Sequence, residues 1–176
     1  CISNGINVRN IVSAIEKIPR VPGRLEYVGN FNKKVFIDYA HTPDSFEKVL
    51  NLLQNIKLEN DKIVTLFGCG GDRDESKRCQ MAKLTEKYSD KVYVTSDNPR
   101  TESIENIIRD ICQGFNENKH EIILDREEAL KRALFEMDSN SILIVFGKGR
   151  ENYQLIGDQK YQHDDVKIIK EALDAS

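Results

Sequence analysis

Short apolar segments rich in β-branched residues alternate along the chain with stretches in which apolar residues recur at helical spacing. Continuous apolar segments of this length are typical of strands that are covered on both faces. Five such strands are predicted, at residues 35–37, 63–67, 92–95, 122–124 and 142–146. The alternation predicts an α/β fold, a Rossmann-like and mostly parallel sheet of about six strands flanked by helices.

Helical periodicity and capping signals predict the helices that connect these strands. Thr42 followed by Pro43 suits a helix start, because threonine caps free amides and proline is tolerated in the first turn. Asp125 with Glu128 three residues later gives a capping-box-like start to another helix. The apolar stripes lie at residues 46–53, 104–115, 130–137 and 166–173.

Two segments fall outside this alternation. Residues 153–156 and 160–162 flank a Gly-Asp-Gln sequence, which predicts a small hairpin near the C-terminus. Residues 1–19 contain a helix-like stretch that ends at prolines before the first strand. We expect residues 1–19 to be the end of an upstream domain and residues 20–176 to form one domain.

Composition and charge favour a cytoplasmic domain that binds small molecules. The chain has 176 residues, 39% of them hydrophobic and 31% charged, which suits a single domain with a continuous core. A net charge of -3 gives no electrostatic footprint for nucleic acid or anionic lipid. No apolar run approaches the roughly 20 residues that cross a bilayer, and the first ten residues lack a signal-peptide pattern.

The cysteines and histidines indicate neither a disulfide framework nor a metal site built from protein ligands alone. The four cysteines include no CxxC pair, so we expect reduced thiols. The three histidines, His41, His120 and His163, lie far apart in the sequence.

Four polar loops follow predicted strands, and in an open parallel sheet such loops meet at one edge, where ligands bind. They are residues 38–43, 68–74, 96–101 and 147–152. Asp38 can accept a hydrogen bond from a ribose hydroxyl, hold a metal-bound water, or only cap the following helix. His41 can donate to phosphate, act as an acid or base, or pack locally.

The second of these loops is rich in glycine, which permits close approach of a ligand or only tight turns. It is not a Walker loop, because GxxxxGK[ST] is absent from the chain. Arg73 and Arg100 can each pair bidentately with a carboxylate or phosphate, and Asp97 and Glu151 add carboxylates. This mixture favours a ligand that carries both ammonium and carboxylate groups, and it leaves the reaction open.

Taken together, the loops resemble the C-terminal domain of the Mur ligases. The segments that carry the resemblance are Val21–Glu26, Asp38–Pro43, Phe67–Asp74, Asp97–Arg100 and Gly147–Gln154. Asp97-Asn98-Pro99-Arg100 is similar to the motif of the members that add diaminopimelate as the third residue of the peptidoglycan stem peptide. The resemblance implies that residues 1–19 are a remnant of the central ATP-binding domain and that residues 20–176 form the C-terminal domain.

The resemblance also implies an activity and its partners. With ATP and Mg²⁺, the full-length enzyme would phosphorylate the D-glutamate carboxylate of UDP-N-acetylmuramoyl-L-alanyl-D-glutamate, and the amine of meso-diaminopimelate or a related diacid such as lanthionine would then attack. The expected partners are these substrates and the upstream central domain, with no nucleic acid and no membrane. Because the P-loop is absent from this chain, we expect it to be inactive alone and to bind no cofactor tightly.

The resemblance implies two groups of binding residues, with no catalytic residue and no metal ligand in this chain. The nucleotide would be contacted by Arg24, Asp38 and His41. The diamino acid would be held by Arg73, Asp97, Asn98, Pro99, Arg100, Gly147 and Glu151. Arg100 suits the distal carboxylate that diaminopimelate has and lysine lacks.

One departure from the family pattern and two alternatives stay open. Arg150 stands where the family often has histidine, so the identity of the diacid is not settled by the motif. A non-catalytic module that binds a diamino acid or a nucleotide is one alternative. A ligase domain like that of the folylpolyglutamate synthases is another, and it would not require Arg100.

Overall fold

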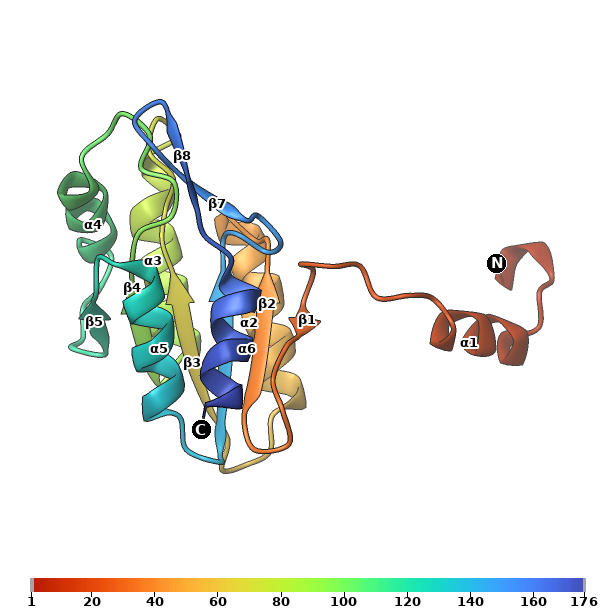
Figure 1. Cartoon of the computed structure of the whole chain (residues 1–176). Coiled ribbons are helices and arrows are strands. Elements are labelled where there is room, and N and C mark those ends of the chain that lie inside the picture. The colour runs from red at the N-terminus through yellow and green to blue at the C-terminus, as the bar shows by residue number, and fades with distance from the viewer. Residues whose placement is uncertain (1, 176) are drawn as a thin grey trace.

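The computed structural model describes residues 2–175, which form a six-stranded sheet with helices on both faces and a separate hairpin (Figure 1). The strands are β1 (Glu26–Tyr27), β2 (Lys34–Asp38), β3 (Lys62–Phe67), β4 (Lys91–Val94), β5 (His120–Ile122), β6 (Ser141–Phe146), β7 (Tyr153–Ile156) and β8 (Gln159–Gln162). The helices are a 3-10 turn (Ile2–Asn4), α1 (Val8–Glu16), α2 (Pro43–Ile56), α3 (Ser76–Tyr88), α4 (Ile104–Cys112), α5 (Arg126–Glu136) and α6 (Asp165–Asp174).

The strand order is β1-β2-β6-β3-β4-β5, with all neighbours parallel except the β1–β2 pair. This confirms the predicted fold class and the hairpin, which is β7–β8. The prediction for β5 was displaced, because the strand spans residues 120–122 rather than 122–124. Its partner β4 ends at Val94, which pairs with Ile122, and this edge strand is only partly covered.

Two elements were not predicted from the apolar pattern. Strand β1 has only two residues and pairs antiparallel with β2 at the edge of the sheet. Helix α3 lacks an apolar stripe because polar side chains share its buried face, among them Arg78, Thr85 and Glu86. Arg78 can be buried there because Glu102 and Asp110 neutralise its charge, at 2.6 and 2.8 Å.

The core has two layers, one on each face of the sheet. Alternation along β6 places Ile144 and Phe146 in the layer beneath α2, α3 and α4, and Leu143 and Val145 in the layer beneath α5 and α6. All six residues of β6 are buried, as expected of a central parallel strand. Phe46 of α2 stacks on Phe146 at a centroid distance of 4.1 Å, so the last residue of β6 is packed in the core directly before the loop at residue 147.

Helix α1 lies apart from this two-layer body (Figure 1). None of its residues is buried, and the apolar side chains of Val8, Val12 and Ile15 are exposed. Among residues 2–175, no helix is both long and apolar enough to span a bilayer.

A buried charge cluster ties α5 and α6 to the sheet. Arg126 and Asp165 form a two-point ion pair at 2.9 and 2.7 Å, and both side chains are almost completely buried. Arg126 also donates to the carbonyl oxygens of Phe146, the last residue of β6, and of Ser96, the first residue of the third polar loop. His163 contacts Asp165 through Nε2 at 2.7 Å. One guanidinium therefore joins the end of β6, the loop after β4 and the starts of α5 and α6.

We expect Asp165→Asn to lower the free energy of unfolding by about 3–5 kcal/mol at pH 7, because it leaves the Arg126 charge buried and unpaired. Burial favours a raised pKa at Asp165, but Arg126 and His163 hold it well below its ordinary value. Its stabilisation is therefore complete above the unfolded-state pKa of about 4 and decreases as the pH falls toward the folded-state value.

Urea unfolding at several pH values measures this effect, with Asp174→Asn as the matched control because Asp174 is exposed at the end of α6. An Asp165→Asn protein as stable as the control would show that the ion pair contributes nothing.

Candidate functional site

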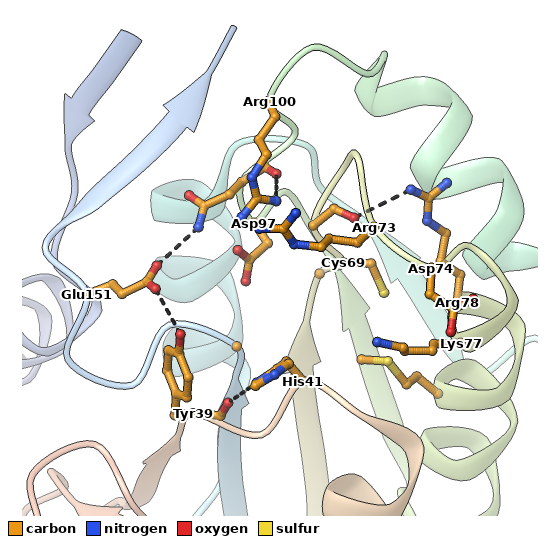
Figure 2. A pocket seen from close by; sticks show the side chains of 15 residues that line it. Tyr39, His41, Cys69, Arg73, Asp74, Lys77, Arg78, Asp97, Arg100 and Glu151 are labelled. Atoms are coloured by element: carbon orange, nitrogen blue, oxygen red, sulfur yellow. Dashed lines mark hydrogen bonds between the residues drawn. The ribbon is translucent and has the colours of Figure 1, made fainter. Parts of the chain in front are cut away.

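The carboxyl ends of β2, β3, β4 and β6 surround a cavity of about 320 Å³, hereafter the main cavity (Figure 2). All four polar loops contribute to it, as predicted from their positions after the strands. It is lined by Tyr39, His41, Gly68, Cys69, Gly70, Arg73, Asp74, Lys77, Arg78, Met81, Asp97, Asn98, Arg100, Gly147 and Glu151. The main cavity thus contains six of the seven residues expected to hold a diamino acid, and Pro99 is the exception.

One side of the main cavity is acidic. The Asp97 carboxylate accepts none of the hydrogen bonds found among residues 2–175 and lies 3.8 Å from Lys148 Nζ. Glu151 Oε2 accepts from Asn98 Nδ2 at 3.1 Å, and its Oε1 accepts from the Tyr39 hydroxyl at 3.3 Å. The two carboxylates therefore keep acceptor capacity for a ligand that donates hydrogen bonds.

Lys148 is a buried cation behind these acids that the sequence reading missed. Its ammonium donates to Asn98 Oδ1 and Tyr153 O, both at 2.9 Å, and lies 3.8 Å from Glu151. Burial lowers the pKa of Lys148, while the Asp97 charge opposes that shift. A lysine between two glycines in a loop usually has a solvent-exposed side chain. The only sign in the sequence that Lys148 is buried is its position just after the end of β6.

The other side of the main cavity is basic. Arg100 Nη1 donates to Gly71 O at 2.8 Å and to Asn98 O at 3.3 Å, and no hydrogen bond from Nη2 or Nε is found within residues 2–175. A methyl group built on Gly70 would lie 2.9 Å from Arg100 Nη1 and 3.8 Å from Arg73 Cγ, so both arginines pass over Gly70. Figure 2 shows the two side chains reaching into the same part of the cavity.

Lys77, Arg78 and Cys69 also line the main cavity and were absent from the predicted site. Lys77 and Arg78 escaped notice because α3 itself was not predicted. Burial raises the pKa of the Cys69 thiol to about 12, so it is a protonated part of the cavity floor at neutral pH.

The β7–β8 hairpin holds the loop that contains Arg100. Arg100 has φ of 54°, donates its amide to Leu155 O at 3.0 Å and accepts from the Gly157 amide at 2.7 Å. The Leu155 amide donates to Asn98 Oδ1 at 2.9 Å, and Gln154 Nε2 donates to Asp97 O at 3.0 Å. The hairpin therefore offsets the unfavourable backbone conformation of Arg100 and determines where its side chain begins.

The three residues expected to contact a nucleotide lie in different positions. His41 lines the main cavity, with Nδ1 2.9 Å from Tyr39 O. Arg24 lies over the Tyr39 ring, 4.7 Å from its centroid, in a neighbouring hollow of about 220 Å³. Asp38 lines neither and accepts hydrogen bonds from the amides of Leu25 and Ala40 at 2.6 and 2.7 Å. Asp38 thus joins two loops, while its oxygens retain further acceptor capacity.

Arg150 lines the neighbouring hollow rather than the main cavity. It forms a two-point ion pair with Glu26, with one contact at 2.8 Å from Nε. The hydrogen bond and charge of Arg150 hold the pKa of Glu26 below its ordinary value despite partial burial. The charge of Arg150 is therefore paired with that of Glu26. The two residues are 124 positions apart in the sequence, so no local sequence pattern predicts the pair.

A family model described as Mur ligase, glutamate ligase domain, matches residues 23–149, which is most of the chain. The chain belongs to the Mur ligase family. This confirms the resemblance that the loop motifs indicated.

Curated relatives of this Mur ligase chain agree with the match. UDP-N-acetylmuramoyl-L-alanyl-D-glutamate--2,6-diaminopimelate ligase 2 of Clostridium acetobutylicum is 46% identical over 172 residues, covering 96% of this chain and 35% of the relative.

The UDP-N-acetylmuramoyl-L-alanyl-D-glutamate--2,6-diaminopimelate ligase of Rickettsia montanensis is 40% identical over 169 residues, with 96% of this chain and 35% of the relative covered. The Mur ligase chain thus spans about a third of the length of these curated relatives. A solved structure of a UDP-N-acetylmuramoyl-L-alanyl-D-glutamate--2,6-diaminopimelate ligase superposes with a TM-score of 0.81 at 35% identity, covering 98% of this chain and 36% of that one.

Structures with lower identity share the fold. A Mycobacterium tuberculosis folylpolyglutamate synthase complexed with ADP and AMPPCP has a TM-score of 0.61 at 20% identity, and the match covers 81% of this chain and 33% of that one. The relationship shows a common architecture. Within residues 2–175 of the Mur ligase chain, no group of three or more His, Cys, Asp and Glu side chains is placed to hold a metal ion.

We expect Gly147→Ala to be more destabilising than Gly157→Ala. A Cβ at position 147 would lie 2.3 Å from Asp97 Oδ2 at a φ of 108°, whereas a Cβ at position 157 meets nothing within 4 Å at a φ of 57°. The second change should cost about 1 kcal/mol, from the backbone conformation alone.

Urea unfolding of both variants measures the difference, and a crystal structure of the Gly147→Ala protein should show a displaced Asp97. Equal stability of the two variants would contradict the close approach at Gly147.

Proposed function

We propose that this chain is the amino-acid-selecting domain of an ATP-dependent ligase that adds a diamino diacid to UDP-N-acetylmuramoyl-L-alanyl-D-glutamate. The observation that carries the proposal is a single cavity with two arginines on one side and two carboxylates on the other. A zwitterion with a second carboxylate and a second ammonium, such as meso-diaminopimelate or lanthionine, matches both sides. The names of the curated relatives support the same substrate class.

The free nitrogens of Arg100 suit the distal carboxylate of the diacid, because a planar guanidinium pairs with carboxylate at two points. Arg73 adds a second cation above Gly70. Asp97 and Glu151 would accept from an ammonium group, while Asn98 and Gly147 shape the surface between the two poles. The task of these residues is to orient the incoming amine and to exclude water.

The chain also has groups suited to a nucleotide at its surface. His41 and Arg24, which both contact the Tyr39 ring, offer donors to phosphate or ribose oxygens, and Asp38 retains acceptor capacity. When bound, ATP supplies the phosphoryl group that activates the acceptor carboxylate. The described residues offer no cluster for Mg²⁺, so we assign its ligands, with the main phosphate site, to the rest of the full-length protein.

We further propose that residues 1–19 belong to the upstream ATP-binding domain and that residues 20–176 form the C-terminal domain. The separation of α1 from the two-layer body and its exposed apolar residues support this boundary. Since the Walker sequence is absent from this chain, we expect the chain alone to lack ligase activity.

We expect the full-length ligase to prefer meso-diaminopimelate or lanthionine over L-lysine. Arg100→Lys should lower kcat/KM for the diacids by at least about 30-fold, because a buried carboxylate loses its two-point partner. The use of L-lysine should change much less. A kinetic panel of the three amino acids with wild-type and variant enzyme measures this.

Arg109→Lys is the matched control, because Arg109 is exposed on α4 and lines neither cavity. A wild-type preference for L-lysine would overturn the proposed substrate class. Equal losses for diacids and lysine in Arg100→Lys would show that Arg100 does not read the distal carboxylate.

For the nucleotide, we expect His41→Ala to raise the KM for ATP about tenfold, the loss of one hydrogen bond to a charged group. The KM for the diacid at saturating ATP should change little, and initial rates over a range of ATP concentrations provide the test. Unchanged ATP kinetics would leave His41 as a residue that only packs against Tyr39.

A further inference from the structure

Tyr39 stands between the two hollows of the site. Tyr39 and Glu151 line both cavities. These are the main cavity, which contains the residues proposed to bind the diacid, and the neighbouring hollow, which contains Arg24. Its side chain is half-buried and rises from the loop directly after β2. Any displacement of this ring therefore changes the walls of two binding surfaces at once.

The hydroxyl end of Tyr39 acts on the acidic side of the main cavity. It donates to Glu151 Oε1 at 3.3 Å, while Asn98 Nδ2 donates to the other oxygen at 3.1 Å (Figure 2). Burial raises the pKa of Tyr39, and the charge of Glu151 raises it further, so the hydroxyl keeps its proton at neutral pH. The two donors fix the carboxylate plane of Glu151.

The ring end of Tyr39 is held by the two residues that we assign to the nucleotide. The Arg24 guanidinium lies 4.7 Å from the ring centroid, and the His41 ring packs edge-on at 5.2 Å. The Tyr39 amide donates to Gly23 O at 2.9 Å, directly beside Arg24. A nucleotide that draws Arg24 or His41 toward its own oxygens must change the packing of this ring.

We propose that Tyr39 is a positioning residue that couples nucleotide binding to diacid affinity through the orientation of Glu151. This inference rests on the proposed function, because it requires the two ligands assigned above. A nucleotide that contacts Arg24 and His41 fixes the orientation of the Tyr39 ring. The Tyr39 hydroxyl then fixes the orientation of the Glu151 carboxylate, to which the diacid ammonium binds. By linkage, the diacid tightens nucleotide binding by the same factor.

The test uses the full-length ligase and calorimetric titration of meso-diaminopimelate, with and without a non-hydrolysable ATP analogue. In the wild type the analogue should tighten diacid binding by about fivefold or more, a common size for such coupling. In Tyr39→Phe, which keeps the ring and loses the hydroxyl, this ratio should fall to near one. The diacid KM should rise about tenfold with little change in kcat. By linkage, the analogue should bind as in the wild type without diacid, and should lose the tightening that saturating diacid gives in the wild type.

Two further variants separate coupling from general damage. Tyr39→Leu, which also removes the ring beneath Arg24, should in addition weaken binding of the ATP analogue in the absence of the diacid. Tyr27→Phe is the matched control, because the Tyr27 hydroxyl donates to Asn30 O at 2.6 Å and lines neither cavity. It should retain wild-type coupling.

The outcomes distinguish this inference from the proposed function. If wild-type enzyme uses the diacid and Tyr39→Phe keeps the full coupling ratio, the coupling role is overturned while the proposed function stands. If active wild-type enzyme shows no coupling between the nucleotide and the diacid, the coupling role is likewise overturned and the proposed function stands. If wild-type enzyme neither binds nor uses any diamino diacid, the proposed function itself is overturned, and the coupling role with it.

Discussion

The ion pair between Arg126 and Asp165 is the interaction on which the geometry of the site depends. Taking two charges out of water is costly, and the pair recovers this through two short contacts and further hydrogen bonds to carbonyl oxygens. Those carbonyls belong to Ser96 and Phe146, so each hydrogen bond fixes the peptide plane that leads into Asp97 or Gly147. Arg126 therefore places the two loops of the acidic side relative to each other from beneath.

The charged side chains of the main cavity stabilise one another. Asp97 and Glu151 would repel each other without a cation nearby, and the Lys148 ammonium lies 3.8 Å from each. Burial disfavours the charge of Lys148, yet the acids favour it, and so acids and base stabilise one another. Lys148 therefore holds the two carboxylates close together on the acidic side of the main cavity.

The sequence was sufficient for features that depend on local pattern. The central strands are continuous apolar segments, so β6 and β3 could be placed, and the loops after them had to share one edge. Helix α3 could not be found this way, because Arg78 lies in its buried face only through partners 24 and 32 residues away. Arg150 stands in the last polar loop, but its pairing with Glu26, 124 residues away, turns it into the neighbouring hollow. Such long-range pairings have no signature in periodicity.

Asn98 illustrates why the site needs its particular polar residues rather than merely polar ones. Its amide nitrogen donates to Glu151, while its oxygen accepts from both the Lys148 ammonium and the Leu155 amide. An aspartate of the same shape would have no proton to donate and would add a third negative charge beside Glu151. A neutral amide is the group that can join a carboxylate on one side to an ammonium and a hairpin on the other. The acidic side, the buried lysine and the loop of Arg100 therefore meet at one side chain.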